Sequence, residues 1–205
     1  MLKKRLVVPY AAGFLLFCCL PALAAVIDND YVRVSRDAAP CAAATSPDCG
    51  ERVIVALSDI EVRSGSSVRR LSRGEVTVFE RGEAFRTPTG GSYFEVAIKP
   101  DHPPVLSPPE IIAAEKNTVR YDGARFFVFE EKLAPGDTRA RHSHSQRVVI
   151  QLNATRLQQW PDGEPMKFVD IPIERPSFSP PVIHVVKNVG DAPLFGIVIE
   201  FRPDR

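Results

Sequence analysis

GDTRARHSH, residues 136–144, holds two histidines two positions apart, and the apolar run 148–150 follows closely. Alternate residues of a β-strand point to the same side, so His142 and His144 would leave one face of a strand. Their imidazoles would then be close enough to bind one ion. The stretch therefore predicts a strand that carries two metal ligands.

A third histidine extends this interpretation. His184 lies in a later run that is also typical of a strand, and Asn188 follows it four positions on. Three neutral imidazoles that converge from two strands form a metal site with coordination positions left open for other ligands. We therefore predict a site made by His142, His144 and His184. The alternative is that these histidines only form hydrogen bonds inside the fold.

The pattern resembles the two motifs of the cupin superfamily, Gly-x5-His-x-His-x3-4-Glu and Gly-x5-Pro-x-Gly-x2-His-x3-Asn. Gly136, His142 and His144 match the start of the first motif, and His184 and Asn188 match the end of the second. The resemblance implies an all-β chain that folds as a double-stranded β-helix, or jelly-roll barrel, with a ligand pocket inside.

The chain departs from the cupin pattern at two places. The two positions open to the motif glutamate hold Val148 and Val149, and Pro181 stands where the second motif has its glycine. Without the glutamate, three histidines leave the metal's full positive charge in the site. Such a site favours Fe, Zn, Ni or Cu over Mn, which prefers oxygen ligands, and it attracts a small anionic or chelating ligand.

Four neighbouring residues are candidates for the rest of the site. Strand alternation would place Gln146 on the face of both histidines, as a fourth neutral ligand, an outer-shell contact or a polar rim residue. Val148 would continue that face and, with Asn188, line the ligand pocket. Arg141 could bind a carboxylate of the ligand, or lie in a solvated loop.

An internal repeat predicts two barrels in tandem. ERVIVAL at 51–57 resembles QRVVIQL at 146–152, and YFEVAIKP at 93–100 resembles GIVIEFRP at 196–203. We expect a first barrel over residues 25–105 and a second, with the metal site, over 106–205. The first barrel is expected to be degenerate, because its only histidine is His102 in the proline-rich linker.

Composition excludes several classes of protein. The 19 prolines argue against long helices. The formal net charge is +1, and no basic cluster is larger than Arg69, Arg70 and Arg73, so no nucleic-acid partner is expected.

Residues 1–24 read as a secretory signal peptide. Lys3, Lys4 and Arg5 precede an apolar stretch too short for a membrane span, and a small-x-small cleavage site ends at Ala24. The mature protein is therefore expected to have no membrane span and to be periplasmic or secreted.

Two cysteines remain after that cleavage. In an oxidising compartment, Cys41 and Cys49 are expected to form a disulfide, with free thiols or metal ligation as the weaker alternative. Closing so short a loop would stabilise the fold by about 2.5 kcal/mol.

Three functions fit these observations. The chain could be a metal-dependent enzyme acting on a small molecule, a non-catalytic protein that binds a small ligand, or a structural module with a vestigial pocket. Barrels of this kind host many functions, so the fold does not decide among them. No general base stands near the histidine motif. Two copies of the chain could also pair as a homodimer.

Overall fold

The computed structural model describes residues 25–39, 41–42, 49–108 and 117–203. Every regular element within these ranges is a β-strand, which confirms the predicted all-β class. The signal peptide predicted for residues 1–24 lies outside the described residues. Within the described ranges, no helix has the length and hydrophobicity needed to cross a membrane.

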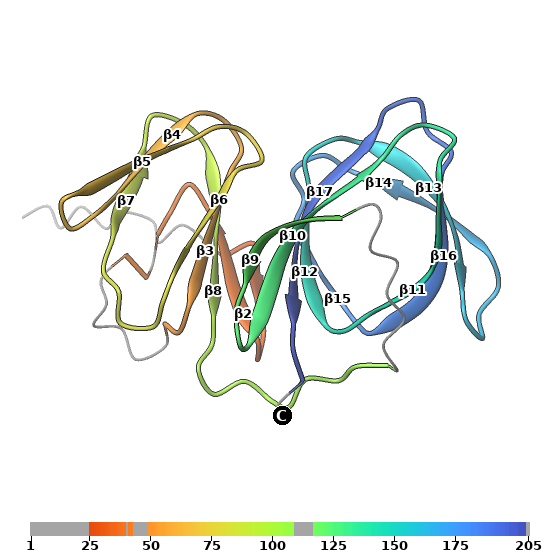
Figure 1. Ribbon diagram of the computed structural model, residues 1–205, viewed down its shortest axis with the longest axis horizontal. Helices are drawn as coiled ribbons and strands as arrows, with labels where there is room; N and C mark the ends of the chain where they lie inside the picture. Colours follow the sequence, from red (N-terminus) through yellow and green to blue (C-terminus); the bar gives the residue numbers. More distant parts are fainter. Residues whose placement is uncertain (1–24, 40, 43–48, 109–116, 204–205) are drawn as a thin grey trace, which may run out of the picture.

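The first half of the chain forms two antiparallel sheets (Figure 1). The larger, sheet 1, has the order β1 (Ile27–Asp28), β2 (Val32–Arg36), β8 (Tyr93–Ile98), β3 (Arg52–Ala56), β6 (Val76–Phe79). The smaller, sheet 2, has the order β5 (Ser67–Leu71), β4 (Ile60–Ser64), β7 (Arg86–Thr89).

The second half of the chain forms two more antiparallel sheets. Sheet 3 has the order β15 (Ser177–Ser179), β12 (Arg147–Gln151), β17 (Leu194–Phe201), β10 (Phe126–Leu133), β9 (Asn117–Asp122). Sheet 4 has the order β11 (Thr138–His144), β16 (Val182–Asn188), β13 (Thr155–Pro161), β14 (Lys167–Ile171). Figure 1 shows the two halves side by side, each as a pair of sheets around its own interior.

The internal repeat predicted from the sequence corresponds to equivalent strands. ERVIVAL contains β3 and QRVVIQL contains β12, and each of these strands pairs with the last long strand of its half, β8 or β17. The strand order of sheet 1 is therefore reproduced in sheet 3, from β1 and β9 at one edge to β6 and β15 at the other. The two halves share one plan.

Sheets 1 and 3 pack face to face through one apolar core. Val53 and Val55 of β3 lie in the same buried cluster as Val148 and Ile150 of β12, and none of the four is exposed. Alternate residues of each strand point into this core, whereas the others point into the barrel of their own half. Burying each Val or Ile contributes about 1.5–3 kcal/mol, so this core holds the two halves together.

The interior of the first half is filled by its own side chains. The Phe79 and Phe85 rings stack 4.3 Å apart, and the Arg52 guanidinium lies 5.2 Å from the centroid of the Phe85 ring. Arg52 is fully buried and donates hydrogen bonds to the backbone carbonyls of Cys41, Glu80 and Glu83. The one described histidine of the first half, His102, lies after β8 and outside the strands of this barrel.

A disulfide joins Cys41 to Cys49, as predicted, with their Cα atoms 5.7 Å apart. Both cysteines are buried and pack against Ala97 of β8. The bond therefore fixes the segment before β3 onto sheet 1, and a disulfide of this kind is typical of proteins that fold in an oxidising compartment.

Glu95 gives the first half a pH-dependent stability. Burial raises its pKa to about 7 from an ordinary 4.5, although Arg52 opposes the rise. Because the folded state holds this proton more tightly than the unfolded state, the contribution of Glu95 to stability is complete below pH 4.5 and is lost as the pH rises to about 7. We expect Glu95→Gln to raise the free energy of unfolding by about 1–3 kcal/mol at pH 8 and to change it little at pH 4.

Urea denaturation of both proteins from pH 4 to pH 8 measures this difference. Other groups that titrate in this window contribute equally to both proteins, so their contribution cancels in the difference. A difference in stability that does not vary with pH would contradict the assignment to Glu95.

Candidate metal site

Strand β11 carries one extra residue relative to its partner β16. Arg139 pairs with Val186, and after an irregularity at residues 140–141 His142 pairs with His184. Such a β-bulge changes the direction of the side chains on either side of it. Both residues of the bulge face solvent, so Arg139 and His142 both point inward and are buried.

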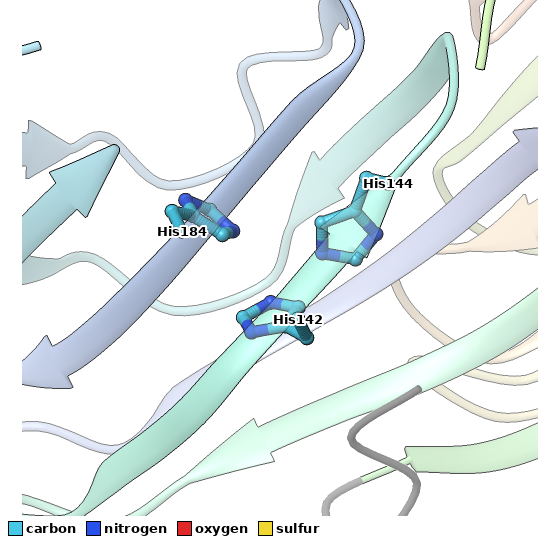
Figure 2. A group of neighbouring side chains, drawn as sticks. All are labelled: His142, His144 and His184. Atoms are coloured by element: carbon cyan, nitrogen blue, oxygen red, sulfur yellow. The ribbon is translucent and has the colours of Figure 1, made fainter. Parts of the chain in front are cut away.

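The structure brings the three predicted histidines together inside the second barrel. The centroid of the His142 ring lies 4.8 Å from that of His144 and 4.6 Å from that of His184. The centroids of His144 and His184 are 5.6 Å apart. One nitrogen from each ring lies within 4.8 Å of the others (Figure 2). Zinc–nitrogen bonds are about 2.0–2.1 Å long, so a bound ion would draw the rings slightly closer together.

Hydrogen bonds orient two of the three rings. Nδ1 of His142 donates to the Ala140 carbonyl at 2.8 Å, and Nδ1 of His144 donates to Oε2 of Glu200 at 2.7 Å. In each neutral ring the other nitrogen, Nε2, then carries the lone pair that can bind a metal. An outer-shell carboxylate or carbonyl on the second ring nitrogen is typical of histidines that bind metals.

The free ring nitrogens meet the main requirement of a metal site. Nε2 of His142 and both ring nitrogens of His184 are buried and have no hydrogen-bond partner within the described residues. Buried polar atoms are rarely left unpaired in folded proteins. A metal ion between the rings would satisfy one nitrogen of each, so the residues present fit such an ion.

Burial also keeps two of the rings in the form that binds metals. Burial, with Arg139 as the next cause, lowers the pKa of His142 to about 3. Burial together with the two neighbouring histidines lowers the pKa of His184 to about 2. Both imidazoles are therefore neutral near pH 7, and neutral imidazole is the common metal ligand.

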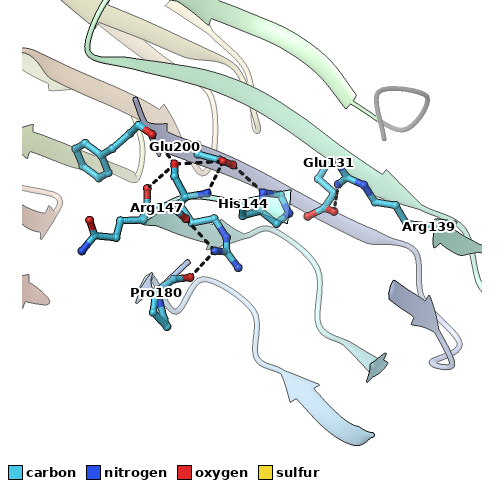
Figure 3. A network of polar contacts seen from close by, with 9 residues as sticks. Glu131, Arg139, His144, Arg147, Pro180 and Glu200 are labelled. Carbon is cyan, nitrogen blue, oxygen red and sulfur yellow. Dashed lines mark hydrogen bonds and ion pairs between the residues drawn. The ribbon is translucent and has the colours of Figure 1, made fainter. Parts of the chain in front are cut away.

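Two carboxylates and two guanidinium groups lie in the same part of the barrel as His144 (Figure 3). Glu200 of β17 bonds His144 through Oε2 and accepts the Ser145 amide through Oε1 at 2.7 Å. Glu131 of β10 forms a buried ion pair with Arg139. With Arg147 as the second cation, the four formal charges cancel, so a divalent ion would leave the site with its own two positive charges.

Arg147 projects from β12 into the space beside the histidines. Its Nη1 donates to the carbonyls of Ser145 at 3.1 Å and Pro180 at 2.8 Å, which hold the guanidinium in place (Figure 3). Burial lowers the pKa of Arg147, with Glu200 acting in the opposite direction. The side chain thus presents a positive charge to the barrel interior.

The second barrel contains a cavity of about 540 Å³, which is a typical size for a small-ligand pocket. The apolar cluster inside this barrel has four buried side chains, with Ile171 packed against them, whereas the cluster inside the first barrel has eight. Fewer apolar side chains leave the interior of the second barrel unfilled. The residues that line it include His144, His184, Arg147, Glu131, Val149, Gln151, Leu157, Gln159, Leu194 and Val198.

Val148 and Gln146, which were predicted to belong to the site, lie outside it because β11 does not continue past His144. β11 ends at His144 and β12 begins at Arg147, so the bend between them resets the alternation. Val148 consequently faces the core between the barrels and not the pocket. Gln146 accepts a hydrogen bond from the Leu106 amide through Oε1, which ties the interdomain segment to the second barrel. The prediction that these two residues line the site is wrong.

Asn188 and Arg141 also have other roles than the predicted ones. The Asn188 amide is fully buried, donates to the carbonyls of Leu133 and Ala192, and accepts from Thr155 and Gly190. It therefore closes the turns at one end of the barrel. Arg141 lies on the bulge, exposed, and pairs with Asp162 at the surface.

Sequence reasoning missed Glu200, Glu131 and Arg147, which provide the charges beside the histidines. Each interrupts or adjoins an otherwise apolar strand, in GIVIEF, FFVFEE and RVVI. A charged residue among the buried positions of a strand is uncommon unless it has a partner or a function. That signal could have found them, although it could not have told which carboxylate contacts which histidine.

The contact between Glu200 and His144 generates a prediction. Glu200→Gln keeps the shape of the side chain but removes the charge that holds the His144 tautomer. We expect it to weaken zinc affinity by about 10- to 100-fold, as outer-shell changes commonly do. The control is Glu130→Gln, which removes a buried carboxylate of the same barrel that pairs with Arg120 and Lys132. Competition titration against a chromophoric chelator measures both, and equal affinities would exclude this role for Glu200.

The chain is similar to known proteins in its structure, but searches with its sequence found no match. No protein-family model and no curated protein sequence matches this chain. Among solved structures, AerE from Microcystis aeruginosa is 14% identical, with a TM-score of 0.52 over 85% of this chain and 88% of its own. A cupin 2 conserved barrel domain protein from Leptotrichia buccalis is 11% identical, with a TM-score of 0.52 over 86% of each chain.

Oxalate decarboxylase from Bacillus subtilis, a protein with Mn(II) centres, matches with a TM-score of 0.53 at 11% identity, over 77% of this chain and 65% of its own. At such identities these likenesses concern the fold. Together with the paired sheets of each half, they show that the chain has the fold of the cupin superfamily, as two jelly-roll barrels in one polypeptide.

Proposed function

We propose that the second barrel binds one divalent metal ion through His142, His144 and His184 and, beside it, a small anionic ligand. The observation that carries the proposal is the buried meeting of three imidazoles, in which Nε2 of His142 and both ring nitrogens of His184 have no partner among the described residues. A bound ion would supply a Lewis acid that polarises an oxygen atom of the ligand. The chain's own residues would position that ligand and limit its contact with water.

The donor set supports a choice among metals. Three neutral nitrogens without a coordinating carboxylate suit Fe, Zn, Ni or Cu better than Mn. The Mn(II) centres of oxalate decarboxylase are a property of that protein. In this chain the carboxylate of Glu200 contacts a ring nitrogen of His144 and so takes an outer-shell position.

The charge balance supports an anionic ligand. Glu200 and Glu131 offset Arg139 and Arg147, so the charge of the metal ion is left for the ligand to neutralise. Arg147 lines the cavity together with His144 and His184. A guanidinium beside a metal centre favours a carboxylate, which can accept two hydrogen bonds from it. Arg147 thus takes the part that the sequence had suggested for Arg141.

A non-catalytic binding protein is the second candidate, and one observation favours it. Both carboxylates beside the histidines are engaged: Glu200 with His144 and Ser145, and Glu131 with Arg139. Neither is free to act as a general base in this arrangement, and general base catalysis needs such a group within reach of the ligand. Turnover of a bound ligand would distinguish an enzyme from a carrier.

Two further proposals concern the whole chain. The predicted signal peptide and the buried disulfide support export to the periplasm or the medium. The boundary between the barrels is proposed at residues 105–106, which lie in the described stretch 99–108 that follows β8 and contains no strand. A homodimer stays a prediction.

Metal titration tests the first half of the proposed function. Wild type is expected to bind one zinc ion per chain, and His142→Ala to lose affinity by at least about 100-fold, more than an outer-shell change would cause. His102→Ala removes the one histidine outside the site and should bind zinc as wild type does. Elemental analysis after gel filtration gives the stoichiometry, and circular dichroism verifies the fold. A wild type that binds no zinc, or a His142→Ala protein that binds it normally, would refute the proposal.

Binding of hexanoate, a simple carboxylate, tests the proposed site for an anionic ligand. Calorimetric titration of the zinc-loaded protein should show binding that Arg147→Met weakens by about 10-fold or more, because a charge-assisted hydrogen bond contributes roughly 1.5–3 kcal/mol. Arg141→Met, which removes a guanidinium from the surface of the same barrel, is the matched control. Equal hexanoate affinities in the two variants would argue against Arg147 as the anion-binding residue.

A further inference from the structure

The cavity of the second barrel has a polar group that the metal site does not use. Gln151 lies four positions after Arg147 on β12, so both side chains point into the same barrel. Gln151 lines the cavity and is only 8% exposed. Its Oε1 is buried and has no hydrogen-bond partner within the described residues. A buried amide oxygen without a partner lowers stability, so a bound group is expected to satisfy it.

Gly196 creates the space in which this amide lies. It pairs with Gln151 across β12 and β17. A Cβ atom on Gly196 would lie 2.7 Å from Oε1 of Gln151 and 3.1 Å from its Cδ and Nε2. The absence of that atom lets the amide lie directly against the β17 backbone. The position of Gln151 is therefore built into the pair of strands.

The wall of the cavity formed by β12 and β17 is polar at two levels, with apolar side chains between them. Arg147, beside the histidines, and Gln151 mark these levels, and their Cα atoms are about 13 Å apart along the strand at 3.3 Å per residue. Val149 of β12 and Val198 of β17 lie between them, whereas the rest of the lining includes further polar residues, among them Glu131, Gln159 and Lys167. A ligand that lies along this wall would carry an anionic group, an apolar middle and a hydrogen-bond donor.

We infer that the ligand is an elongated ω-hydroxy carboxylate: its carboxylate lies at the metal and Arg147, and its terminal hydroxyl donates to Oε1 of Gln151. The inference rests on the proposed function for the carboxylate end. A hydroxyl fits better than an ammonium group, because the Gln151 amide is neutral and offers no charge to balance a cation.

Matched pairs of ligands test this inference by calorimetry on the zinc-loaded protein. The pairs are hexanoate with 6-hydroxyhexanoate, octanoate with 8-hydroxyoctanoate, and decanoate with 10-hydroxydecanoate. At one length at least, the hydroxy acid should bind about 10-fold more tightly than its parent, because a site built for a hydroxyl rejects the analogue that lacks it. Gln151→Leu should abolish this preference and leave the affinity for the parent acid within about twofold.

Gly196→Ala is a second variant, in which the new Cβ displaces the amide without removing it; it too should lose the preference. The inference would be overturned if wild type bound no hydroxy acid more tightly than its parent acid at any chain length, as expected when water alone satisfies the amide. It would also be overturned if Gln151→Leu kept the preference for the hydroxy acid. If zinc and hexanoate bind normally in these same experiments, the proposed function stands and only the inference fails. If neither binds, both fail.

Discussion

The pairing of β11 with β16 is the constraint on which the rest of the site depends. One extra residue in β11 shifts the register so that His142 lies opposite His184, and the alternation of the strand brings His144 to the same side. The bulge also turns Arg139 inward, where it pairs with Glu131. A single local irregularity therefore sets both the three ligands and one of the charge pairs beside them.

The two barrels share one arrangement of strands but differ in what occupies their interiors. Their large sheets have equivalent strand orders and pack against each other through one apolar core. In the first barrel, stacked Phe79 and Phe85 and the buried Arg52 fill the interior, and the disulfide fixes the segment that leads into β3. The second barrel instead contains the cavity described above. We infer that the first barrel supports the face of sheet 3 from which Arg147 and Gln151 enter the cavity.

Local patterns predicted the features that depend on short stretches of sequence. The His-x-His spacing placed two rings on one face because side chains of a strand alternate regardless of their surroundings. The motif spacing around His184 and the repeated segments at 51–57 and 146–152 predicted the third ring and the two-barrel plan.

Other features depend on contacts between distant strands, and the sequence could not predict them. The bend between His144 and Arg147 reversed the face of Val148, because one or two residues without strand geometry are enough to reset the alternation. Glu200 reaches His144 from a strand 56 positions later. The burial of Arg139 follows from the bulge, which no local spacing indicates.

Anomalous diffraction from crystals of the zinc-loaded protein tests most directly whether three imidazoles meet on one metal ion. We expect one strong peak in the second barrel, about 2.0–2.1 Å from one nitrogen each of His142, His144 and His184. A peak at any other place, or three rings joined only by water with no peak between them, would contradict this expectation.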